Sequence, residues 1–163
     1  MAATMIMKIS GIAGDCARDG HRDWIEILNY TQAVARPERG GGAPQFMDFS
    51  VSKYSDRSSP LLAMACYEGW RLQEVVVETL ASDGTKLMEL RLSDAEVSNF
   101  NVSGGGDPDH PAYDSLCFRY GKLEWLYFPK GGGEPTKSLW ASEEYRGPAG
   151  AAAPGARRNG GRV

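Results

Sequence analysis

The segment from Asp48 to Cys66 constrains the fold more than any other part of the chain. Polar and apolar residues alternate from Asp48 to Tyr54, which is typical of a strand with one buried face. The Ser-Ser-Pro sequence ending at Pro60 predicts a helix start, because Ser59 can cap the helix N-terminus and Pro60 suits the first helical position. Apolar residues follow at once from Leu61 to Cys66. The chain must therefore turn directly from a strand into a helix.

The predicted helix, from Pro60 to about Glu68, carries almost no polar residue. Gly69 is suited to end it in a left-handed conformation. A helix that is apolar all round has more faces than one small domain can cover. A second subunit is one way to cover the remaining face, and Leu61, Leu62 and Met64 are the hypothesised subunit-interface residues.

Strand patterns dominate the rest of the chain. Strands are predicted over Met5–Ile9, Trp24–Tyr30, Phe46–Tyr54, Leu72–Leu80 and Ser115–Phe128, with a return strand after the Asp83-Gly84 hairpin signal. The apolar residues change parity near Asp94 or Ala95 and again at Gly121, which predicts bulges there. Two bulged long strands favour a mainly β fold, a closed or nearly closed β-barrel of two packed sheets with one flanking α-helix.

A chain of 163 residues suits one domain with its own core. We expect the β-barrel domain to occupy residues 1–129. Residues 130–163 form a Gly/Ala/Pro-rich C-terminal segment, and the part from Gly147 to Val163 buries too little apolar surface to order itself. We therefore expect this segment to be partly disordered.

Charge and cysteine content exclude several classes of protein. The chain has 18 basic and 21 acidic residues, a net charge of −3, so it lacks the basic field needed to hold nucleic acid. Three widely spaced cysteines, an odd number, argue against a secreted disulfide framework. The sequence contains no run of about twenty apolar residues, so we expect no membrane insertion. The N-terminus does not resemble a signal peptide.

No motif in the sequence specifies catalysis or a cofactor. Asp109 and His110 lie in a loop with two prolines, which matches neither an EF-hand nor a zinc signature, and His21 has no nucleophile-elbow sequence nearby. We expect no catalytic residue, no cofactor and no metal. A small metal-dependent hydrolase stays open as an alternative if a histidine lies in a pocket beside carboxylates. A carbohydrate-binding β-domain also stays open, since four tryptophans are present.

Many short motifs resemble those of one family. In chain order they are Met7-Lys8-Ile9, Gly11-Ile12-x-Gly14, His21-x-Asp23-Trp24-Ile25-Glu26-Ile27-Leu28, the segment from Asp48 to Pro60, Ala65-Cys66, Glu74-Val75, Leu90-x-Leu92-x-Asp94, Val97-Ser98 and Tyr120-Gly121-Lys122-x-Glu124-Trp125-x-Tyr127-x-Pro129. Their order and spacing resemble the haemolysin-coregulated proteins (Hcp), the tube subunits of type VI secretion. The motif Ser138-Leu139-Trp140-Ala141 lacks the Gly-Trp pair typical of the family's last strand.

The resemblance implies a structural protein rather than an enzyme. Its relatives form hexameric rings that stack into a hollow tube, carry effectors in the lumen, and are fired with a spike by a contracting sheath. The implied partners are further copies of the chain together with sheath, spike and effector proteins. The implied location is the cytoplasm before firing and the exterior afterwards, reached without a signal peptide.

Two further sets of residues follow from the resemblance. The segment from Ile25 to Val34 corresponds to the lumen lining, which makes Thr31 and Gln32 candidate effector contacts. In relatives, the loop after that segment contacts the neighbouring ring. Here it contains Arg36, Glu38 and Arg39, which carry both signs of charge and become candidate stacking residues.

Overall fold

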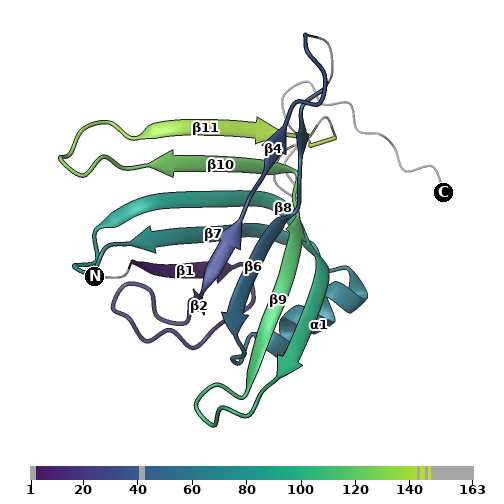
Figure 1. Ribbon diagram of the computed structural model, residues 1–163, viewed down its shortest axis with the longest axis vertical. Coiled ribbons are helices and arrows are strands. Elements are labelled where there is room, and N and C mark those ends of the chain that lie inside the picture. The colour runs from purple at the N-terminus through teal and green to yellow at the C-terminus, as the bar shows by residue number, and fades with distance from the viewer. Residues whose placement is uncertain (1–2, 41–42, 143, 146, 148–163) are drawn as a thin grey trace.

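The computed structural model describes residues 3–40, 43–142, 144–145 and 147 (Figure 1). In this part of the chain there are eleven strands and one helix. In chain order they are β1 (Thr4–Ile9), β2 (Ile25–Ile27), β3 (Asn29–Thr31), β4 (Val34–Ala35), β5 (Gln45–Phe46), β6 (Phe49–Tyr54), α1 (Ser59–Glu68), β7 (Leu72–Leu80), β8 (Lys86–Gly104), β9 (Ala112–Arg119), β10 (Lys122–Tyr127) and β11 (Thr136–Ala141). The expectation of a mainly β fold with one helix is confirmed.

Two antiparallel sheets share the long strand β8. Sheet A has the order β2-β1-β7-β8-β10-β11, and sheet B has the order β8-β9-β6-β3. The first part of β8 pairs with β7 and β10, whereas its later part pairs with β9. Figure 1 shows the strands of the two sheets crossing steeply, with α1 beside sheet B. The core lies between the inner faces of the sheets.

Asp94 and Gly121 show the backbone irregularities expected there, but the register of β8 shifts later, between Val97 and Asn99, and a shift that the sequence did not predict lies between Thr79 and Leu80 of β7. Asp94 has a positive φ of 52°, and the Gly121 amide donates to the carbonyl oxygens of both Ser93 and Asp94. Opposite this bend, Tyr120 and Gly121 separate β9 from β10. The parity switch therefore marks the place where a long strand leaves sheet B and enters sheet A.

The predicted closed barrel is not confirmed. The hydrogen-bonded path runs from β2 to β3, and neither sheet closes on itself among the described residues. The predicted strand over Trp24–Tyr30 is instead split: β2 pairs with β1, and β3 pairs with β6. Leu28, between them, donates its amide to the Ser52 carbonyl oxygen of β6. One short stretch of chain thus passes from the edge of sheet A to the edge of sheet B.

The C-terminal segment contributes a strand that the sequence did not predict. β11 pairs with β10 along its whole length, from Lys122 opposite Ala141 to Tyr127 opposite Thr136. Ordered structure therefore continues past residue 129, despite the missing Gly-Trp pair. The predicted disorder over Gly147–Val163 falls almost entirely outside the described residues.

The loop before β2 covers the outer face of sheet A with a second apolar cluster. Cys16 packs there with Ile6 of β1 and Leu80 of β7, and all three are almost completely buried. The Gly14 amide donates to the Asp23 carbonyl oxygen at 2.7 Å, which closes the two ends of the loop on each other. The polar loop expected from the sequence is therefore a packed part of the structure.

We predict that Gly14→Ala destabilises the protein by about 1–3 kcal/mol, the usual cost of overpacking. A Cβ at Gly14 would lie 2.5 Å from the Trp24 carbonyl oxygen and 2.8 Å from the Ile25 Cα, so the backbone itself would have to move. Gly106→Ala is the matched control, since a Cβ there meets nothing within 4 Å. Urea unfolding measures both free energies, and equal stability of the two variants would contradict the prediction.

Candidate functional site

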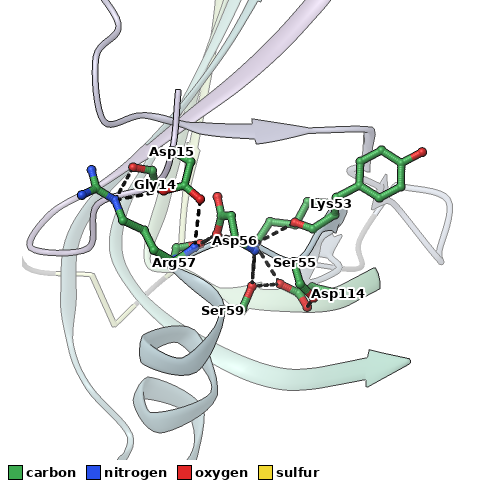
Figure 2. Close-up of polar contacts among 10 residues, drawn as sticks. Gly14, Asp15, Lys53, Ser55, Asp56, Arg57, Ser59 and Asp114 are labelled. Carbon is green, nitrogen blue, oxygen red and sulfur yellow. Dashed lines mark hydrogen bonds and ion pairs between the residues drawn. The ribbon is translucent and has the colours of Figure 1, made fainter. Parts of the chain in front are cut away.

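A buried cluster of ionic and polar groups joins β6 to the start of α1 (Figure 2). The Lys53 ammonium lies 2.8 Å from Asp114 Oδ2 and 2.9 Å from Asp56 Oδ1, and it donates to Ser59 Oγ at 3.0 Å. The side chains of Lys53 and Asp114 are both completely buried. Such a buried charge needs close counter-charges, because removing it from water is costly. The cluster therefore fixes β6, β9 and the first turn of α1 relative to one another.

Ser59 completes this cluster instead of capping the helix. Its Oγ accepts from the Asp56 amide and from Lys53, and its hydroxyl donates to Asp114. The N-cap residue is Ser58, whose side chain makes no capping hydrogen bond. Ser58 instead donates its amide to Asp56 Oδ1 at 2.8 Å. The predicted cap at Ser59 is therefore wrong by one position, because tertiary partners engage its hydroxyl.

The pairing of a serine with a lysine suggests nucleophilic catalysis, but the geometry here does not support it. Both lone pairs of Ser59 Oγ and its proton are engaged, and the residue is 8% exposed. A substrate has neither access to this hydroxyl nor a free lone pair to activate. The cluster is a structural support for α1.

We predict that Lys53→Met destabilises the protein by about 3–5 kcal/mol, because it leaves the Asp114 carboxylate buried without its cation. Adding Asp114→Leu to this variant should recover part of the loss. Arg71→Met is the control: its ion pair with Asp94 is exposed, so we expect a change within about 0.5 kcal/mol. Urea unfolding at neutral pH measures all three, and a small effect of Lys53→Met would contradict the structural role.

An apolar surface lies on the outer side of α1. Leu61 is 42% exposed, Met64 43% and Tyr67 88%. The three residues repeat every third position and so lie along one side of the helix. Leu62, in contrast, is completely buried in the core of its own chain. Of the three hypothesised interface residues, Leu61 and Met64 are exposed and Leu62 is not, while sequence reasoning missed Tyr67.

The two candidate effector contacts differ in their surroundings. Thr31 ends β3 and is exposed. The Gln32 amide nitrogen donates to the carbonyl oxygens of Ala33 and Met47, at 3.0 and 3.3 Å. Gln32 therefore bridges the two chain segments at the base of the β4–β5 hairpin. Thr31 is the more accessible of the pair.

An open, largely apolar hollow of about 360 Å³ lies beside Thr31. It is lined by Tyr30, Thr31, Gln32, Val34, Leu90, Trp125 and Trp140. The outer wall is exposed: Val34 is 53% and Trp125 40% accessible. This hollow offers aromatic and aliphatic surface next to the candidate effector contact.

The three candidate stacking residues lie on a projecting hairpin. Arg36, Glu38 and Arg39 are exposed in the loop that joins β4 to β5. Figure 1 shows this hairpin extending well beyond the body of the molecule. At its base, Phe46 stacks on Tyr120 with ring centroids 5.0 Å apart. The hairpin is thus anchored to the core and carries its charges outward.

Both histidines have carboxylates beside them, and His110 lines an open cavity with Asp15, Glu26 and Asp56. His21 Nε2 lies 2.8 Å from Glu78 Oε2, so the half-buried His21 links the loop before β2 to sheet A. His110 stacks on Tyr54 at 3.8 Å, and its Nδ1 faces Asp107. A hydrogen bond from the Asp109 amide, and a smaller contribution from the hydrogen bond with the His110 side chain, lower the pKa of the Asp107 carboxyl. Within the described residues, no three His, Cys, Asp or Glu side chains converge to hold a metal ion.

Comparison with known protein families identifies the chain. Residues 6–127 match the family model described as type VI secretion system effector, Hcp. The chain belongs to the Hcp family. The protein Hcp1 of Pseudomonas aeruginosa is 26% identical over 156 residues, which is 86% of this chain and 95% of that protein.

Solved Hcp structures share the fold. Hcp1 from Salmonella typhimurium superposes with a TM-score of 0.78 at 20% identity, covering 86% of this chain and 95% of that one. A type VI secretion system effector from Yersinia pestis gives a TM-score of 0.73 at 20% identity, covering 85% of this chain and 99% of that one. The coverage extends over nearly the whole of each relative.

Membership of the Hcp family decides between the functions left open by the sequence. Hcp proteins are structural, secreted tube proteins of type VI secretion systems, and they oligomerise. The chain is therefore not an enzyme, which removes the hydrolase alternative. In the described part of the chain, α1 is too short to cross a membrane.

Proposed function

We propose that this Hcp chain forms closed hexameric rings that stack into the inner tube of a type VI secretion system and carry effectors in the lumen. The observation that carries the proposal is the apolar surface of α1. Leu61, Met64 and Tyr67 remain exposed in the single chain, although α1 is anchored rigidly by the Lys53 cluster. A rigid, exposed apolar surface is typical of a protein interface.

A ring requires head-to-tail contacts, in which one surface of each subunit meets a different surface of the next. The outer side of α1 supplies one such surface. Fully burying a leucine or methionine side chain stabilises a contact by roughly 1.5–3 kcal/mol relative to leaving it fully exposed. Leu61 and Met64 are already more than half buried in the single chain, so each gains only part of that amount, before the cost of association is subtracted. Three such side chains repeated at every contact support a stable ring.

We predict that native mass spectrometry of the purified chain finds a closed ring, six-membered by family resemblance. Met64→Arg should shift the population to monomers, because it places a charge at the centre of an apolar contact. Its folding stability should change by no more than about 0.5 kcal/mol, since the side chain is exposed in the monomer.

Leu139→Arg is the matched control, because Leu139 is 53% exposed and lies on β11, which pairs only with β10 among the described strands. It should leave the ring intact. Wild-type protein that remains monomeric or forms only two-fold dimers across a range of salt concentrations would rule out the ring.

We place Thr31 at the lumen surface, where it contacts a carried effector. Its exposure at the end of β3, beside the hollow walled by Val34 and Trp125, supports this placement. The remaining partners follow from the family: a contracting sheath around the tube, and a spike at its tip. The tube assembles in the cytoplasm, and firing exports its subunits.

We predict that Thr31→Arg leaves the ring intact and weakens retention of a small cognate effector, because the larger charged side chain occupies the contact. Thr31→Ser, which keeps the hydroxyl, is the control and should retain the effector. Co-purification of effector with rings measures the difference. Equal retention by both variants would show that Thr31 does not contact cargo.

A further inference from the structure

The open cavity beside His110 has no role in the assembly proposed above. Its volume is about 560 Å³, which is within the range of small-molecule sites. It is bounded by the start of β1, the loop before β2, β2 itself and the end of β6. Its described lining includes none of the residues proposed for the ring, the stack or the cargo contact. The cavity is therefore available to hold a ligand of its own.

Four charged side chains line the cavity besides His110, and two of them are already neutralised. Asp56 is paired with the buried Lys53, and Asp15 is paired with Arg57 (Figure 2). These two carboxylates belong to the contacts that hold the start of α1. The other two charges are available to a ligand.

Those two charges, on Arg18 and Glu26, lie near each other without forming an ion pair. The Arg18 guanidinium donates to a neutral group, Thr4 Oγ1, at 3.2 Å. Glu26 lies directly opposite Ile6 in the register of β1 and β2, and it has no ion pair with any described residue. Thr4 and Ile6 are two positions apart on one face of β1, which is roughly 7 Å along the strand. The cavity thus presents a guanidinium and a carboxylate within the span of one small ligand.

Apolar side chains form another part of the wall. Met5 and Ile27 lie opposite each other in β1 and β2, and Leu28 follows at the end of β2. Leu28 is 40% exposed, so it has apolar surface left to cover. Removing such surface from water favours the binding of an apolar group. Two opposite charges and an apolar wall together describe the ligand.

We propose that this cavity binds a small zwitterion with an apolar side chain, the chemistry shared by a free amino acid such as leucine and by a short apolar peptide. The carboxylate of the ligand accepts from the Arg18 guanidinium, its ammonium donates to Glu26, and its side chain packs on Leu28. Charge-assisted hydrogen bonds of this kind are stronger than neutral ones. A ligand with one charge leaves the other group of the cavity unpaired, so it binds more weakly. Binding requires neither the ring nor the stack, so this inference stands apart from the proposed function.

The test compares leucine with two relatives that each lack one charge. Leucinamide has no carboxylate, and N-acetyl-leucine has no ammonium. Leucyl-leucine, whose charges are farther apart, tests the peptide source. Isothermal titration calorimetry measures each affinity for the wild-type chain, Arg18→Gln and Glu26→Gln, and circular dichroism checks the fold. Arg22→Gln is the matched control, because Arg22 is exposed in the same loop and does not line the cavity.

We expect leucine to bind with a Kd of about 1 mM or tighter, and each singly charged relative to bind on the order of tenfold more weakly, the effect of losing one hydrogen bond between charged groups. Arg18→Gln should weaken leucine binding to a similar degree and abolish the preference for leucine over leucinamide. Glu26→Gln should abolish the preference for leucine over N-acetyl-leucine, and the control should match wild type.

Tighter binding of leucyl-leucine, with the same dependence on Arg18 and Glu26, would support the inference and identify a short peptide as the ligand. Three results would each overturn it: no binding of leucine or leucyl-leucine at about 10 mM, equal affinity for leucine and both of its singly charged relatives, or unchanged leucine binding in both cavity variants. Native mass spectrometry of the same samples reports on the ring separately, so loss of rings would bear on the proposed function alone.

Discussion

The buried ammonium of Lys53 is the interaction on which the arrangement of α1 depends. On β6, Phe49, Val51 and Lys53 all point inward, so the lysine takes the position where a third apolar side chain would be expected. Its charge is tolerated only because Asp114 on β9 and Asp56 in the turn meet it within hydrogen-bonding distance. The same requirement determines where β6 ends and where α1 begins. The outer side of α1 is consequently held at a fixed orientation.

The sequence predicts those turns and helix ends whose conformation depends on neighbouring residues. Gly69 ends α1 with a φ of 70°, as a helix C-cap glycine should. Gly84 adopts a φ of 89° in the predicted hairpin, and its neighbour Asp83 accepts from the Thr85 amide. The parity switch at Gly121 likewise marks a real bend. The conformations of Gly69 and Gly84 depend on residues close together in the chain, which is why the pattern alone was sufficient. The bend at Gly121 also involves the distant carbonyl oxygens of Ser93 and Asp94.

Features decided by distant partners were not predictable in the same way. The apolar run over Trp24–Tyr30 gives no sign that β2 and β3 pair with strands of different sheets, because that choice depends on β1 and β6. Similarly, α1 is apolar on every side, so its sequence has no periodicity to separate buried Leu62 from exposed Leu61. The position of Gln32 at the hairpin base depends on the Met47 carbonyl oxygen, which no sequence pattern reports.

The surfaces proposed for ring formation and for stacking differ in their physical chemistry. The outer side of α1 is apolar, so a contact built on Leu61 and Met64 is driven by removal of surface from water and is insensitive to moderate salt. The hairpin carries exposed charges, and the contacts that such charges make are screened as ionic strength rises. Added salt should therefore separate stacked rings long before it separates subunits. In the proposed assembly the ring would be the stable unit, and the tube would be a reversible assembly of rings.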